Sequence, residues 1–130
     1  MTATALKKEM DMVDVQNSQA WQKVCSKADL VKFSGVAAWL ETAEGPAQVA
    51  IFYLPGKGDE LYALDHFDPF SNANVIARGI VGDIKGAAVV ASPIYKQHFR
   101  LDDGQCLEDE EVKLRTWKIA FKGDEVWIEG

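Results

Sequence analysis

Three residues supply the side-chain types of a hydrolytic triad, namely Asp68, Ser92 and His98. In such a triad a carboxylate orients an imidazole, which takes the proton of the attacking hydroxyl. Ser92 precedes Pro93 and lies outside the G-x-S-x-G elbow that exposes a serine nucleophile. Because nothing in the sequence places His98 against Ser92, the pattern does not favour hydrolysis.

Two further stretches resemble ligand-binding patterns, but each lacks a required feature. The glycines of residues 78–86 do not follow the G-x-G-x-x-G order of a phosphate-binding loop, and no helix is expected after them. They are typical of turns and bulges. The acidic run, residues 108–111, consists of consecutive carboxylates that point in different directions along an extended chain. We interpret it as a solvated face or a partner-facing charge patch, not as a cation site.

Metal-ligating residue types are sparse. Cys25 and Cys106 form no C-x-x-C or C-x-x-H pair, so neither begins a zinc site. His66 and His98 are the only two histidines, which excludes a histidine-rich metal site. We interpret both thiols as small apolar groups or bystanders and not as reactive nucleophiles.

The elements that must position these residues are short strands separated by turns. We expect strands at residues 21–26, 36–41, 48–54, 60–64, 80–84, 87–91, 98–101, 112–121 and 125–128. Residues 42–46 read as a turn, and two proline-containing segments, residues 65–77 and 92–97, read as structured loops. The apolar residues of 112–121 change parity near Arg115, which predicts a bulge or twist there. This texture predicts an antiparallel all-β domain.

Composition indicates one domain and argues against several classes of partner. The 130 residues match the commonest domain size; we assign residues 20–130 to the domain and residues 1–19 to a mobile N-terminal arm. A net charge of −6 argues against nucleic acid and against an anionic membrane surface. No apolar run approaches the ~18 residues of a membrane span, and no signal peptide is evident. We therefore expect a soluble, cytoplasmic protein.

The two proline-containing loops carry a resemblance to a known kind of site. Residues 63–70 and 90–101 resemble the two ligand boxes of Rieske [2Fe–2S] domains, in which two cysteines and two histidines hold the cluster. On that alignment all four ligands are replaced. The residues at these positions are Asp68, Phe70, Ser92 and Tyr95. Phenylalanine has no donor atom, and the other three are poor substitutes for thiolate and imidazole. His66 and His98 are displaced from the ligand positions.

One family shows the same departure from the Rieske pattern. Residues 68–75, 78–83 and 89–99 resemble the small subunit of assimilatory NAD(P)H-dependent nitrite reductase, and the similarity extends over residues 21–130. The resemblance implies an antiparallel Rieske-like (ISP) fold with a small β subdomain that carries the two former cluster-binding loops. It also implies a large-subunit partner that bears FAD, sirohaem and a [4Fe–4S] centre and reduces nitrite to ammonium with NADH or NADPH. No cofactor is expected in this chain.

Three functions are open for the chain itself. The favoured one is a binding subunit that docks on the large subunit through the tip of the two loops. The partner-binding candidates are Phe67, Phe70, Ile94, Tyr95, Lys96 and His98. Phe70 and Tyr95 have a second interpretation, in which they fold inward and fill the volume of a cluster. The alternatives are a stand-alone Rieske-type electron carrier, which the absent ligands disfavour, and a module that binds nitrite or nicotinamide near Arg78, Lys96 and His98.

Overall fold

The computed structural model describes residues 21–56 and 60–130, so the arm expected at residues 1–19 lies outside the described part. The named strands pair antiparallel throughout, which confirms the all-β prediction. They are β1 (Trp21–Ser26), β2 (Ser34–Thr42), β3 (Gly45–Tyr53), β4 (Leu61–Asp65), β5 (Phe67–Asp68), β6 (Ala73–Asn74), β7 (Ile80–Ile84), β8 (Ala87–Ala91), β9 (His98–Arg100), β10 (Thr116–Lys122) and β11 (Glu125–Glu129). The helices of the described residues are single 3₁₀ turns, η1 (Lys27–Asp29) and η2 (Ile76–Arg78). Neither is long enough to cross a membrane.

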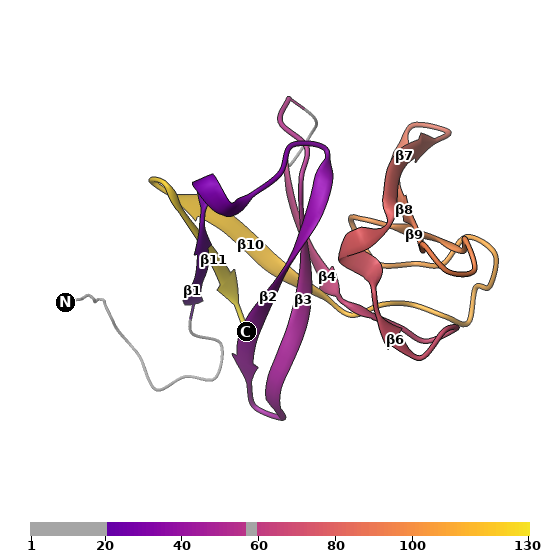
Figure 1. Cartoon of the computed structure of the whole chain (residues 1–130), viewed down its shortest axis with the longest axis horizontal. Coiled ribbons are helices and arrows are strands. Elements are labelled where there is room, and N and C mark those ends of the chain that lie inside the picture. The colour runs from indigo at the N-terminus through magenta and orange to yellow at the C-terminus, as the bar shows by residue number, and fades with distance from the viewer. Residues whose placement is uncertain (1–20, 57–59) are drawn as a thin grey trace.

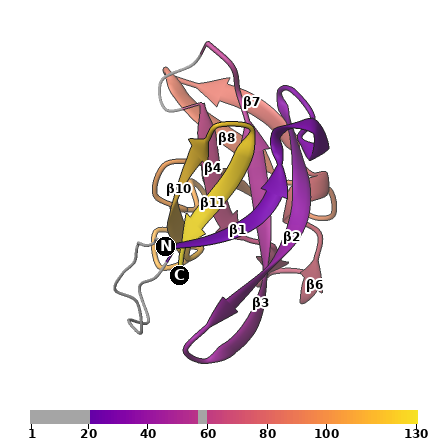
Figure 2. The same cartoon turned by 90° about the vertical axis from the view of Figure 1, so that its left-hand side faces the viewer.

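The larger part of the domain is a curled six-stranded sheet in the order β1-β11-β10-β4-β3-β2 (Figure 1). Its two edge strands approach each other, as Figure 2 shows. The side-chain amide of Gln22 in β1 donates to the backbone carbonyl of Glu41 in β2 at 2.6 Å and accepts its N–H at 3.1 Å. The Gln22 side chain thus links β1 to β2 with the same donor and acceptor pattern that a paired strand would provide.

The smaller part lies beside this sheet and carries β5 to β9, with a three-stranded sheet ordered β7-β8-β9 (Figure 1). β3 lies between the cores of the two parts and is buried on both faces. Val49 and Ile51 face the core inside the curled sheet, whereas Ala50 and Phe52 face the core under the smaller part. Gly35 sits where the parts touch, since a Cβ there would meet the Ala77 carbonyl and the Phe52 ring.

Two expectations about element boundaries were wrong. β2 extends to Thr42 and β3 resumes at Gly45, so the turn is shorter than residues 42–46. β10 begins only at Thr116, and Val112 and Leu114 pack in the core under the smaller part. The change of parity near Arg115 therefore marks the crossing of the chain between two cores, and β10, which begins after Arg115, pairs with β4 and β11 without a bulge.

Candidate functional site

The two proline-containing loops meet through a buried hydrogen bond. Ser92 Oγ donates to Asp68 Oδ2 at 2.5 Å, which joins positions 24 residues apart. Both residues are fully buried, with no exposed surface. We expect from the sequence that these positions align with the two cysteines of a Rieske site, and here a direct hydrogen bond joins the two loops.

Each loop is also closed by its own backbone hydrogen bonds. Asp68 Oδ1 accepts the Phe70 N–H at 2.9 Å, and the Asp68 carbonyl accepts the Asn72 N–H at 2.8 Å. In the second loop the Ser92 N–H donates to the Gln97 carbonyl at 2.9 Å. Because both turns are closed and joined, the side chains that project from them have fixed backbone anchors.

The two positions that align with Rieske histidines have different environments. Phe70 is partly buried and packs against the core under the smaller part, with its ring centroid 6.2 Å from that of Phe99. Tyr95 is 61% exposed. Phe70 thus occupies the interior side of the tip, and Tyr95 stands on its surface next to Ile94, which is also exposed.

His66 is a buried structural residue. Its Nδ1 accepts the Ala77 N–H at 3.1 Å, and its carbonyl accepts the N–H groups of Val75 and Ile76. Burial, assisted by the nearby Arg78 guanidinium, lowers the pKa of His66 below its ordinary value of 6.5. The neutral ring therefore anchors the start of η2, and its acceptor nitrogen is already engaged.

His98 is paired with the first residue of the acidic run and not with Ser92. Its Nδ1 lies 2.7 Å from Glu108 Oε2, and its N–H donates to Glu108 Oε1 at 2.8 Å. Partial burial acts to raise the pKa of Glu108, but the His98 hydrogen bonds outweigh it, so the pKa lies below its ordinary value. The Gln105 side-chain amide donates to the backbone carbonyls of Cys106, Glu110 and Val112, and so fixes the backbone within and on both sides of the acidic run. The three triad residue types are therefore not assembled into a triad.

Exposed large apolar side chains occur on both parts of the domain, and three of them, Phe67, Ile94 and Tyr95, lie at the tip. Of the nine large hydrophobic side chains that the described residues expose, five belong to the smaller part and only four to the larger. The five are Phe67, Ile80, Ile94, Tyr95 and Leu107. Our sequence interpretation missed Ile80 and Leu107. The alternation of the strand at residues 80–84 was the signal for Ile80, because its neighbour Val81 faces the core.

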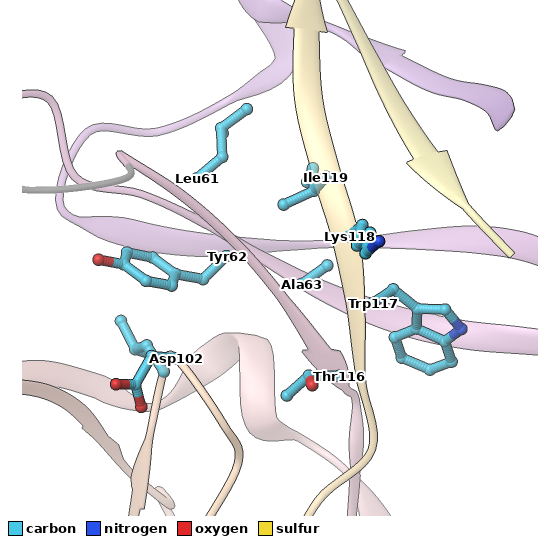
Figure 3. Close-up of a pocket in the computed structure, with 9 residues that line it drawn as sticks. Leu61, Tyr62, Ala63, Asp102, Thr116, Trp117, Lys118 and Ile119 are labelled. Atoms are coloured by element: carbon cyan, nitrogen blue, oxygen red, sulfur yellow. The ribbon is translucent and has the colours of Figure 1, made fainter.

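A pocket of about 340 Å³ is lined by residues outside the two loops (Figure 3). It lies where β4 and β10 diverge beyond their last pair, Trp117 with Ala63, and the Leu101–Asp102 turn borders it. Its lining contains neither Lys96 nor His98. This pocket therefore does not correspond to the anion-binding cleft considered between the loops.

The residues at the four former ligand positions do not fit a [2Fe–2S] cluster. The Asp68–Ser92 hydrogen bond takes up the two cysteine positions, and Phe70 offers only a carbon ring against Phe99. Within residues 21–56 and 60–130, no group of three or more His, Cys, Asp or Glu side chains is arranged to hold a metal ion. Burial raises the pKa of the Cys25 and Cys106 thiols, which keeps them protonated. The fold and the two joined loops together define a Rieske-like domain.

Comparison with known proteins places the chain more narrowly. Residues 20–129 match the model of the Rieske-like [2Fe-2S] domain family. The chain is 38% identical over 110 residues to the nitrite reductase (NADH) small subunit of Salmonella typhimurium, covering 85% of this chain and 97% of that protein. The solved structure of the Escherichia coli protein NirD matches with a TM-score of 0.73 and 36% identity, over 85% of this chain and 96% of that one. The chain belongs to the family of nitrite reductase small subunits.

A further relative has a different architecture. The nitrite reductase [NAD(P)H] large subunit of Klebsiella oxytoca is 38% identical over 111 residues. These residues are 85% of this chain but only 11% of that protein. A segment similar to this chain is therefore part of the large-subunit polypeptide itself in that relative.

Proposed function

We propose that the chain acts in the cytoplasm as a non-cluster-binding subunit of NAD(P)H-dependent nitrite reductase, by associating with the large subunit through its tip. The large subunit supplies FAD, sirohaem and the [4Fe–4S] centre, and this chain supplies a rigid docking element. The observation that carries the proposal is the exposed apolar tip, formed by Phe67, Ile94 and Tyr95, on two loops that a buried hydrogen bond holds together. Apolar anchors on a preorganised backbone lose little entropy on binding, which favours their use in an interface.

The Klebsiella relative supports the choice of partner. Its large subunit contains the segment similar to this chain, so the two are held in one polypeptide there. Tethering raises the effective concentration of two modules to the millimolar range. Separate chains must achieve the same association through surface contacts. A cluster of exposed hydrophobic side chains on a small acidic domain fits this requirement.

The test is a titration of this chain against its own large subunit. We expect saturable binding, and a rise in nitrite-dependent NADH or NADPH oxidation or in the thermal stability of the large subunit. Tyr95→Ala and Phe67→Ala should each weaken binding by about tenfold or more if they are central anchors. Trp39→Ala is the matched control, because Trp39 is 64% exposed on the larger part of the domain. Unchanged melting temperatures would show that the tip variants act on the interface.

Two outcomes would contradict the proposal. An absence of binding between the purified subunits would contradict the proposed association with the large subunit. Stoichiometric iron and acid-labile sulfide in the isolated chain would support the electron-carrier alternative. We expect instead a colourless protein, because the donor set at Asp68, Phe70, Ser92 and Tyr95 does not fit a cluster.

A further inference from the structure

The exposed apolar surface continues from the tip along one line of the three-stranded sheet. Ile80 in β7 pairs with Ala91 in β8, and Ala91 pairs with His98 in β9. The Leu107 N–H donates to the His98 carbonyl at 2.9 Å, which places Leu107 opposite His98 on the next segment. These four residues, which we call the lateral row, cross the sheet from edge to edge directly beside the second loop.

The side chains of the lateral row lie on the face of the sheet that points away from the core. Residues that stand opposite each other in a sheet project to the same face, and their neighbours along the strand project to the other. The neighbours Val90, Phe99 and Cys106 are buried at 0%, 0% and 2% exposure in the core under the smaller part. The lateral row therefore faces outward, and its ends, Ile80 and Leu107, are 68% and 42% exposed.

Opposite charges stand at the two ends of the lateral row. The exposed Arg78 precedes Ile80 by two residues, whereas the acidic run directly follows Leu107. In the middle, the His98–Glu108 pair is fixed by two hydrogen bonds from His98. The face thus has an exposed apolar side chain at each end, the polar His98–Glu108 pair between them, a cation near one end and the acidic run near the other. A partner surface with the reverse arrangement of charges would be bound in one orientation only.

We propose that the lateral row is the second half of the docking face for the large subunit, and that its charged ends set the orientation of the complex. This inference rests on the proposed function. The occupant is a large-subunit surface with apolar side chains facing Ile80 and Leu107, carboxylates facing Arg78 and cations facing the acidic run. Two features favour this occupant: the lateral row is continuous with the tip through Ala91 and Ser92, and a relative carries this domain within its large subunit.

The test measures the affinity for the large subunit after truncating each end of the lateral row. Ile80→Ala and Leu107→Ala should each weaken binding by about five- to tenfold, and the double variant by about thirtyfold or more. Val31→Ala is the matched control, because Val31 is an exposed β-branched residue on the larger part. Raising the salt concentration should weaken binding of the unaltered chain, and charge reversal by Glu110→Lys should reduce that salt dependence.

The outcomes separate this inference from the proposed function. If Tyr95→Ala weakens binding while the double variant binds as tightly as the Val31→Ala control, the lateral row is not part of the interface and the proposed function stands. If the unaltered subunits do not bind each other, the proposed function is refuted, and this inference is refuted with it. A third result would be dimerisation of the isolated chain, lost in the double variant without any change in large-subunit binding. It would make a second copy the occupant and overturn the proposal.

Discussion

Replacing Ser92 by alanine tests whether one hydrogen bond holds the two loops together. The substitution removes the hydroxyl that donates to Asp68 Oδ2 and leaves that oxygen fully buried without its partner. A hydrogen bond to a charged group contributes about 1.5–3 kcal/mol, and an unsatisfied buried group costs a similar amount. We therefore expect Ser92→Ala to reduce the free energy of unfolding by about 2–3 kcal/mol. For a domain of this size that corresponds to a fall in melting temperature of roughly 8–12 °C.

The chain offers a matched control for this prediction in the other loop. Ser71 Oγ is also buried but has no hydrogen-bond partner among the described residues. Removing it should cost nothing or stabilise the protein slightly, because no partner is lost. Asp68→Asn is a useful second variant, since its amide can still donate to Ser92 and its oxygen can still accept the Phe70 N–H. We expect a smaller loss for Asp68→Asn than for Ser92→Ala.

The assay is chemical denaturation at fixed pH, combined with a double-mutant cycle of Asp68→Ala and Ser92→Ala. The two substitutions should be strongly non-additive, because each removes the same hydrogen bond. The reasoning would be refuted by additivity within about 0.5 kcal/mol, the limit expected of independent sites. It would also be refuted if Ser92→Ala were no more destabilising than Ser71→Ala.

Three further predictions concern the surroundings of the site. Phe70→Ala should lower the free energy of unfolding by about 2–3 kcal/mol, because it opens a cavity beside Phe99, and denaturation against a wild-type reference measures this. Burial lowers the pKa of His66 in the folded protein, so just below pH 6.5 the unfolded chain binds a proton at His66 more readily than the folded chain does. The contribution of His66 to the free energy of unfolding is therefore complete above pH 6.5 and should fall as the pH drops below that value. His66→Asn, which keeps an acceptor, should flatten that pH dependence in urea titrations. Gly104→Ala should prevent folding or lower the melting temperature sharply, because Gly104 has φ +80° and a Cβ would clash with the Leu114 carbonyl.

The sequence predicted the strands well where a single core decides the pattern. The hairpin at residues 80–91 follows from alternation and a glycine turn, and its boundaries match β7 and β8. The strand expected at 112–121 was too long, because its apolar residues serve two cores. Val112 and Leu114 pack under the smaller part, whereas Trp117 packs inside the curled sheet. Periodicity records which residues are apolar but not which core each one enters.

The proximity of the two loops could be predicted from the sequence, but the packing of their side chains could not. The resemblance placed the two loops together, and the Asp68–Ser92 hydrogen bond agrees with that placement. The orientations of Phe70 and Tyr95 remained open because both are aromatic and both flank a loop proline. The neighbouring Phe99 provides a partly enclosed contact for Phe70, and no comparable contact encloses Tyr95. Such a difference arises from tertiary packing and is not encoded in local spacing.

The buried polar residues explain how the two loops keep their arrangement. His66, Asp68 and Ser92 are the three buried polar residues of the described chain, and each hydrogen-bonds a segment distant from it in sequence. A metal cluster cross-links two loops by coordination. Here the Asp68–Ser92 carboxylate–hydroxyl pair cross-links them directly, and Phe70 packs against Phe99. The backbone is thereby kept rigid, while the outer positions are free to carry side chains such as Tyr95 and Ile94 that suit a protein surface rather than iron.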